Sequence, residues 1–153
     1  MCGIFAVFQK DKIIEKDLFK FSLSQLEHRG PDNTTTYYPS SNFGGLGHCR
    51  LSIIDQHSRS NQPYTKNNNS LIYNGEIYNY MTLKDKYSFL PESINSDKEM
   101  LFLMLKHNLN DSDFLESFRG MWAFLYLNEA KKEVFCSRNR YGVKPLLYWK
   151  SND

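Results

Sequence analysis

The chain opens Met1-Cys2-Gly3-Ile4-Phe5-Ala6-Val7-Phe8, a small nucleophilic residue followed by an apolar run. Residues 4–8 have the length and composition of a buried strand, which predicts that Cys2 is held at the end of a sheet. Because Cys2 is small, removal of Met1 is favoured, and the thiol and a free α-amine then share one residue. An α-amine titrates at about 7.7–8.0, so it can accept the thiol proton near neutral pH. An isolated cysteine behind an initiator methionine is more often incidental, so the hypothesis depends on residues further along.

Composition bounds the possible classes of protein. The chain has 153 residues, 41% hydrophobic and 15% aromatic, which suits one domain with its own core. The net charge is +2, from 19 basic and 17 acidic residues, and gives no electrostatic reason to expect a nucleic-acid or membrane partner. The N-terminus lacks the basic stretch of a signal peptide. With no CxxC or zinc spacing, we expect a cytoplasmic chain whose Cys49 and Cys136 are buried structural thiols.

Hydrophobic spacing predicts a mixture of helices and strands. Ser96 and Glu99 stand three residues apart before an apolar helix that carries Leu101, Met104 and Leu105, the pattern of a capping box. The other expected elements are a helix over 17–28, strands over 34–38, 44–54 and 71–73, a loop over 56–70, a hairpin of 121–127 with 133–137, and a strand over 145–149. Helices near the middle with strands at both ends favour an α+β layered fold.

A series of short motifs follows Cys2 along the chain. They are His28-Arg29-Gly30-Pro31-Asp32, Arg50-Leu51-Ser52-Ile53-Ile54-Asp55, Gln62-Pro63, Tyr73-Asn74-Gly75-Glu76-Ile77-Tyr78-Asn79, Ser96-Asp97, Gly120-Met121-Trp122-Ala123-Phe124 and Arg140-Tyr141-Gly142-Val143-Lys144-Pro145-Leu146. With Met1-Cys2-Gly3-Ile4 in front, the series resembles class II glutamine amidotransferases, most closely the glutaminase domain of glutamine-dependent asparagine synthetases. The resemblance covers residues 1–153 as one glutaminase domain. It implies an N-terminal-nucleophile hydrolase fold, a four-layer αββα sandwich, with Cys2 at the end of a central strand.

The resemblance also implies a reaction. Cys2 would attack the side-chain carbonyl of glutamine, forming a γ-glutamyl thioester and ammonia, and water would then release glutamate. The Asn74 side chain and the Gly75 backbone N–H would stabilise the oxyanion that forms in each half of the reaction. Losing one such donor typically costs about 10²–10³ in rate. Taken alone, Asn74-Gly75 is more often a hairpin turn.

Free glutamine carries two further charged groups. The resemblance implies that Arg50 binds the α-carboxylate, for which its bidentate geometry is suited. Asp97 would receive the α-ammonium, with Glu76 as a second group facing it. Each has a structural alternative, since Arg50 fits an ion-paired strand residue and Asp97 fits a helix start. Arg29 and Asp32 are interpreted as shaping the loop near Cys2, and His28 and His48 as structural.

The chain lacks the phosphate-binding Ser-Gly-Gly-x-Asp-Ser loop of the family's synthetase domain. We therefore expect ammonia to pass to a separate ATP-dependent synthetase. Relatives continue beyond Lys144-Pro145-Leu146 through further strands, so the resemblance implies a domain truncated at the C-terminus, with an open sheet edge. The alternative is an inactive relative that binds glutamine or a partner, and a third possibility is an amidase for another amide. No part of the mechanism calls for a metal or cofactor.

Overall fold

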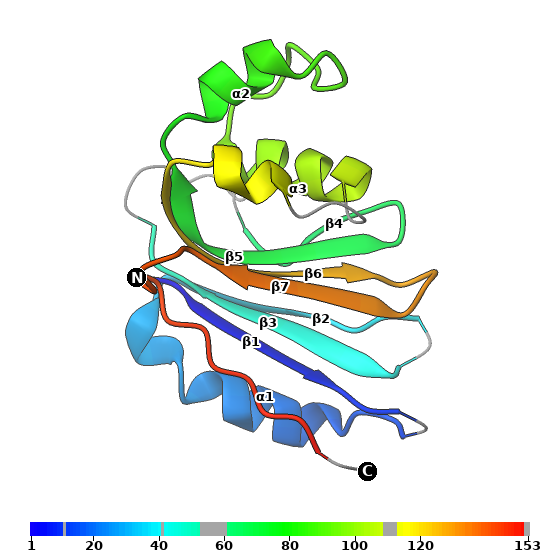
Figure 1. Ribbon diagram of the computed structural model, residues 1–153. Coiled ribbons are helices and arrows are strands. Elements are labelled where there is room, and N and C mark those ends of the chain that lie inside the picture. Colours follow the sequence, from blue (N-terminus) through cyan, green and yellow to red (C-terminus); the bar gives the residue numbers. More distant parts are fainter. Residues whose placement is uncertain (11, 41, 53–60, 109–112, 152–153) are drawn as a thin grey trace. The chain divides into compact units, whose positions relative to one another are not determined.

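The computed structural model describes residues 1–10, 12–40, 42–52, 61–108 and 113–151 (Figure 1). These residues form a mixed α+β fold of two sheets and several helices, as expected from the sequence. The strands are β1 (Gly3–Phe8), β2 (Asn33–Tyr37), β3 (Gly44–Arg50), β4 (Tyr64–Lys66), β5 (Asn69–Ile77), β6 (Gly120–Asn128) and β7 (Glu133–Arg138). The helices are α1 (Lys16–Ser24), α2 (Tyr80–Lys86) and α3 (Asp97–Asn108), with 3-10 turns η1 (Glu27–Arg29) and η3 (Asp113–Ser117).

The chain divides into two compact units. The first comprises Met1–Asn74 with Leu127–Val134, and the second comprises Gly75–Tyr126 with Phe135–Asp153. One sheet has the order β1-β3-β2 and the other the order β4-β5-β6-β7. Strand β5 therefore passes from the first unit into the second between Asn74 and Gly75.

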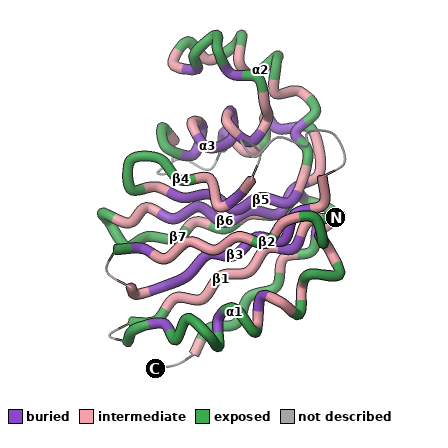
Figure 2. The backbone as a smooth tube through the Cα atoms, turned by 180° about the vertical axis from the view of Figure 1, so that it is seen from behind, coloured by how far each residue is buried: buried purple, intermediate pink, exposed green. Residues whose placement is uncertain are grey.

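Strand β3 is the centre of the sheet in the first unit. It pairs antiparallel with β1 and with β2, so that Cys49 lies opposite both Gly3 and Thr34. Every residue of β3 is buried, as the continuous purple tube in Figure 2 shows. Strand β1 is confirmed, but the expectation that it is central is wrong for the described residues. With one paired neighbour it is an edge strand, and residues 4–8 are only partly buried.

Helix α1 packs against β3 because two glycines leave room for it. A Cβ on Gly45 would lie 2.8 Å from the Phe19 ring, and one on Gly47 would lie 2.7 Å from a Leu23 methyl. Phe19 and Leu23 are 3% and 1% exposed, so they occupy the space left by the missing side chains. The helix ends at Ser24, earlier than expected, and a 3-10 turn follows.

The helix and the hairpin predicted from capping and strand signals are both present. The Glu99 N–H donates to Ser96 Oγ at 3.2 Å, which caps α3 as expected. Leu101, Met104 and Leu105 of α3 are each fully buried. Strands β6 and β7 are hydrogen-bonded neighbours, so the hairpin is confirmed. Cys136, expected to be buried, is exposed because β7 is the edge strand of its sheet.

Three expectations about loops and strands need correction. The loop expected over 56–70 contains β4 and the beginning of β5, while residues 56–60 lie outside the described residues. The strand expected over 44–54 ends at Arg50, and residues 53–54 likewise lie outside. The strand expected over 145–149 is wrong, since this segment has no strand structure and its Leu147, Tyr148 and Trp149 side chains are exposed.

Within the described part of the chain, no helix has the length and apolar character needed to cross a bilayer.

The packing of α1 predicts opposite outcomes for two leucines of that helix. Leu23→Ala removes a side chain that is 1% exposed and is expected to lower the free energy of unfolding by about 2–5 kcal/mol. Leu18→Ala, at a position that is 57% exposed, should change it by less than about 0.5 kcal/mol. Urea unfolding followed by circular dichroism measures both. Equal losses for the two variants would contradict the packing described here.

Candidate functional site

Cys2 lies directly before β1 and is partly buried. The Leu51 N–H donates to Cys2 Sγ at 3.5 Å, and the thiol lies 3.9 Å from the Leu51 carbonyl oxygen. Arg29 Nε donates to the Cys2 carbonyl oxygen at 3.4 Å. Leu51, directly after β3, therefore holds the side chain of the predicted nucleophile, and Arg29, the last residue of η1, holds its main chain.

The segment Arg29–Asp32 lies against the end of β3. A Cβ on Gly30 would come within 2.4 Å of the Cys49 carbonyl oxygen, which only glycine tolerates. The Asp32 N–H donates to the Arg50 carbonyl oxygen at 3.0 Å, and Asp32 Oδ2 accepts from the Ser52 N–H at 2.6 Å. These contacts agree with the interpretation that Arg29 and Asp32 shape the surroundings of Cys2.

Arg50 is the last residue of β3 and is 7% exposed. Its Nη1 donates to Asn61 Oδ1 at 2.8 Å. Leu51, which contacts Cys2 Sγ, directly follows Arg50 in the chain. The predicted nucleophile therefore touches the neighbour of the predicted carboxylate-binding residue. Within the first unit, Cys2 is thus held by the residue that follows Arg50.

Asn74 lies inside β5 and is 5% exposed. The hairpin-turn alternative for Asn74-Gly75 is therefore wrong, and so is the expectation that the strand ends there, because β5 continues to Ile77. The preceding residue, Tyr73, exchanges two hydrogen bonds with the Gln62 side chain: its N–H donates to Oε1 at 2.6 Å and its carbonyl accepts from Nε2 at 3.0 Å.

The remaining predicted site residues lie in the second unit. Gly75 and Glu76 continue β5, and the Glu76 side chain is exposed. Asp97 begins α3, and its Oδ2 accepts from the Ile77 N–H at 3.0 Å. A Cβ on Gly120 would lie 2.1 Å from the Glu76 carbonyl oxygen, so β6 begins directly against Glu76. Asp97 and Glu76 are therefore neighbours within this unit, joined through Ile77.

Two histidines and one cysteine have structural environments. His48 is 1% exposed and its Nε2 lies 3.3 Å from the Tyr73 carbonyl oxygen, while His28 Nδ1 lies 2.9 Å from the Gln25 carbonyl oxygen. Burial raises the pKa of the Cys49 thiol, which is fully enclosed in β3. These contacts agree with the structural interpretation of His28, His48 and Cys49.

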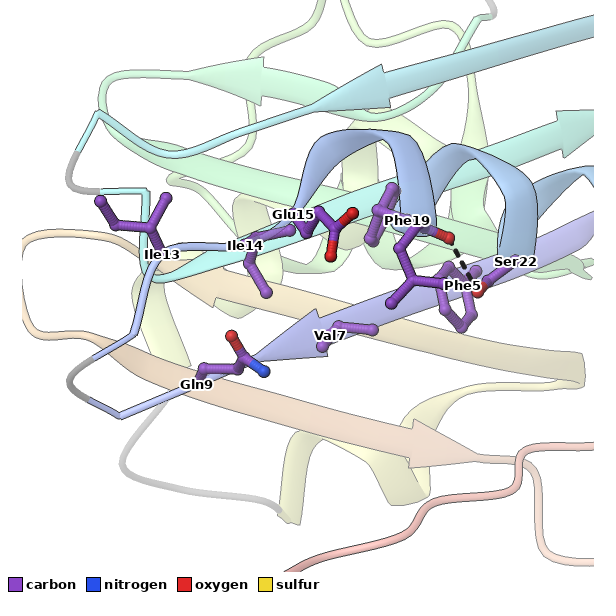
Figure 3. Close-up of a pocket in the computed structure, with 9 residues that line it drawn as sticks. Phe5, Val7, Gln9, Ile13, Ile14, Glu15, Phe19 and Ser22 are labelled. Atoms are coloured by element: carbon purple, nitrogen blue, oxygen red, sulfur yellow. Dashed lines mark hydrogen bonds between the residues drawn. The ribbon is translucent and has the colours of Figure 1, made fainter.

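A groove of about 280 Å³ lies between β1 and α1, lined by apolar side chains that include Phe5, Val7, Ile14 and Phe19 (Figure 3). None of the predicted site residues lines it. Among the residues that the structure describes, no group of three or more His, Cys, Asp or Glu side chains could hold a metal ion.

Sequence reasoning missed two residues next to the site, Asn61 and Gln62. The Gln62-Pro63 dipeptide belongs to the motif series, but a sequence motif does not show which groups its side chains hydrogen-bond. The signal that could have found Gln62 is the proline after it, which interrupts strand pairing. The catalytic and substrate-binding roles of Cys2, Asn74, Gly75, Arg50, Glu76 and Asp97 stay predictions.

Thiol alkylation tests the environment of Cys2. Iodoacetamide added to the folded protein is expected to modify the partly buried Cys2 and the exposed Cys136, and to leave Cys49 unmodified until urea unfolds the chain. Peptide mass spectrometry reads out each site. Modification of Cys49 in the folded protein, at a rate matching that of Cys136, would contradict the burial of β3.

Comparison with known proteins agrees with the resemblance seen in the sequence. A family model described as a glutamine amidotransferase domain matches residues 1–153. A Methanocaldococcus jannaschii protein named as a putative glutamine-hydrolysing asparagine synthetase is 34% identical to this chain. The match covers 100% of this chain and 33% of the relative. Glutamine-hydrolysing asparagine synthetase 1 of Bacillus subtilis is 31% identical, with 100% of this chain and 25% of the relative covered. Amidase chry2 of Gibberella zeae is 35% identical, with 83% of this chain and 19% of the relative covered.

The chain thus spans a third or less of the length of these relatives. The family model covers every residue from Cys2 to Asp97 that the sequence singled out. The chain belongs to the glutamine amidotransferase domain family.

Proposed function

We propose that this chain hydrolyses glutamine to glutamate and ammonia through a thioester on Cys2. The observation that carries the proposal is the contact of Cys2 Sγ with Leu51, which directly follows the buried Arg50. A nucleophile held by the residue that follows a buried arginine fits a substrate that carries a carboxylate at one end and a reactive amide at the other.

The first half of the reaction forms the thioester. After Met1 is removed, the α-amine of Cys2 takes the thiol proton and the sulfur attacks the side-chain carbonyl carbon of glutamine. The tetrahedral oxyanion is stabilised by the Asn74 side-chain amide and the Gly75 backbone N–H. The carbon–nitrogen bond then breaks, and the protonated α-amine returns the proton to the leaving group, which departs as ammonia.

The second half regenerates the enzyme. Water loses a proton to the α-amine of Cys2 and attacks the thioester carbonyl. The same two donors stabilise the second oxyanion, the carbon–sulfur bond breaks, the α-amine returns its proton to the sulfur of Cys2, and glutamate leaves. Throughout, Arg50 holds the α-carboxylate, and Asp97 and Glu76 hold the α-ammonium.

We further propose that the ammonia is used by an ATP-dependent synthetase. The support is the printed names of the relatives from M. jannaschii and B. subtilis, which are glutamine-hydrolysing asparagine synthetases three or more times as long as the matched segment. The amide-forming step would take place outside residues 1–153.

The nucleophile is tested by Cys2→Ala. Glutamate release from glutamine is expected to fall to background in this variant, because the proposed nucleophile is removed. Cys136→Ala, which removes an exposed thiol, should retain the activity of the unaltered protein. Intact mass establishes that Met1 is absent from each preparation.

Retained glutamate release in Cys2→Ala would refute the thioester mechanism. Glutamine binding by calorimetry without any glutamate release, in a folded protein that lacks Met1, would favour the inactive binding module instead. Release of ammonia from another amide that glutamine does not inhibit would favour an amidase with a different substrate.

The carboxylate-binding role predicts the kinetics of Arg50→Lys. Loss of one charge-assisted hydrogen bond is expected to raise KM about 10–100-fold and to leave kcat nearly unchanged, because the carboxylate is bound equally before and during the reaction. Arg140→Lys, at an exposed position, serves as the matched control. An unchanged KM in Arg50→Lys would remove Arg50 from the substrate site.

A further inference from the structure

The backbone pairing between β4 and β5 ends at Tyr64, the residue directly after Pro63. Tyr64 pairs with Leu71, Thr65 with Ser70 and Lys66 with Asn69. Continued along both strands, this register puts position 62 opposite Tyr73. The residue between, Pro63, has no N–H to donate, so the backbone cannot continue the ladder there.

The Gln62 side chain takes over where the backbone ladder ends. Its Oε1 accepts from the Tyr73 N–H at 2.6 Å, and its Nε2 donates to the Tyr73 carbonyl oxygen at 3.0 Å. Two residues facing each other in an antiparallel sheet exchange the same pair of bonds through their backbones. Gln62 is 8% exposed, and its main-chain carbonyl oxygen accepts from Thr35 Oγ1 of β2, so the main chain of Gln62 is held as well as its side chain.

The neighbouring residue reaches a different part of the predicted site. Asn61 Oδ1 accepts from Nη1 of the buried Arg50 at 2.8 Å. Two consecutive side chains thus contact Arg50 and the residue directly before Asn74.

We infer that Asn61-Gln62 is a positioning dipeptide for glutamine hydrolysis: Asn61 directs the Arg50 guanidinium, and Gln62 fixes the strand that presents Asn74. The inference rests on the proposed function of Arg50 and Asn74, through which both members of the dipeptide act. The two members have separable effects on the kinetics. Carboxylate binding is shared by ground and transition states and sets KM, whereas the oxyanion exists only during reaction and sets kcat.

The kinetic test compares Asn61→Leu with Gln62→Met in the full chain without Met1. Asn61→Leu is expected to raise KM about 3–30-fold with kcat within about twofold of the unaltered protein. Gln62→Met is expected to lower kcat about 10–100-fold, up to the effect of losing an oxyanion donor, with KM within about threefold. Gln25→Met, at an exposed position after α1, is the matched control and should match the unaltered protein. Parallel changes of kcat and KM in both variants would indicate general loosening and overturn the inference.

A second readout does not depend on turnover. In Gln62→Met, hydrogen exchange of the Tyr73 amide is expected to accelerate at least about tenfold, while amides of residues 69–71, which pair with β4, keep their protection. Asn61→Leu should leave Tyr73 exchange unchanged. If the unaltered protein releases no glutamate, the proposed function fails, and exchange at Tyr73 alone decides whether Gln62 holds the strand. Unchanged Tyr73 exchange in Gln62→Met overturns the inference whatever the activity.

Discussion

The close approach of the Arg29–Asp32 segment to the end of β3 is the constraint on which the predicted nucleophile depends. A Cβ on Gly30 would meet the Cys49 carbonyl oxygen at 2.4 Å and the Arg50 carbonyl carbon at 2.5 Å, and a backbone cannot move aside as a side chain can. This contact brings Arg29 to the Cys2 carbonyl oxygen and Asp32 to the Arg50 carbonyl oxygen. The main chains of the predicted nucleophile and of the predicted carboxylate-binding residue are therefore fixed by one short segment.

Elements with strong local signals could be predicted from the sequence. The apolar run behind Cys2 forms β1, and the Ser96 cap starts the apolar helix α3. Elements that depend on a distant partner could not. Tyr64–Lys66 is polar and lies beside an asparagine-rich turn, and it becomes β4 only by pairing with β5. Residues 145–149 have the composition of a strand, but an apolar run without a ladder partner among the described residues remains irregular.

The identities of the candidate site residues followed from motifs, whereas their surroundings depended on sheet order. Cys49 and Cys136 both lie in apolar segments, yet only Cys49 is buried, because β3 is central in its sheet and β7 is at an edge. The pattern of apolar residues within one strand does not show whether that strand is central or at the edge of its sheet. The same reasoning applies to Asn74-Gly75, a dipeptide typical of turns that here lies within β5, because pairing along the strand continues to Ile77.

A strand whose residue stabilises an oxyanion has to be held firmly and still leave one side accessible to the substrate. A full backbone partner would fix β5 but would also line its edge as far as Asn74. The β4–β5 ladder ends at Tyr64 and Leu71, and Gln62 then satisfies both backbone groups of Tyr73 through a side chain. Residues 61–63 are therefore outside the strand, and the side chain of Asn61 accepts a hydrogen bond from Arg50. Replacing a backbone partner by a side-chain amide fixes the strand as far as Tyr73 without adding a strand residue opposite Asn74.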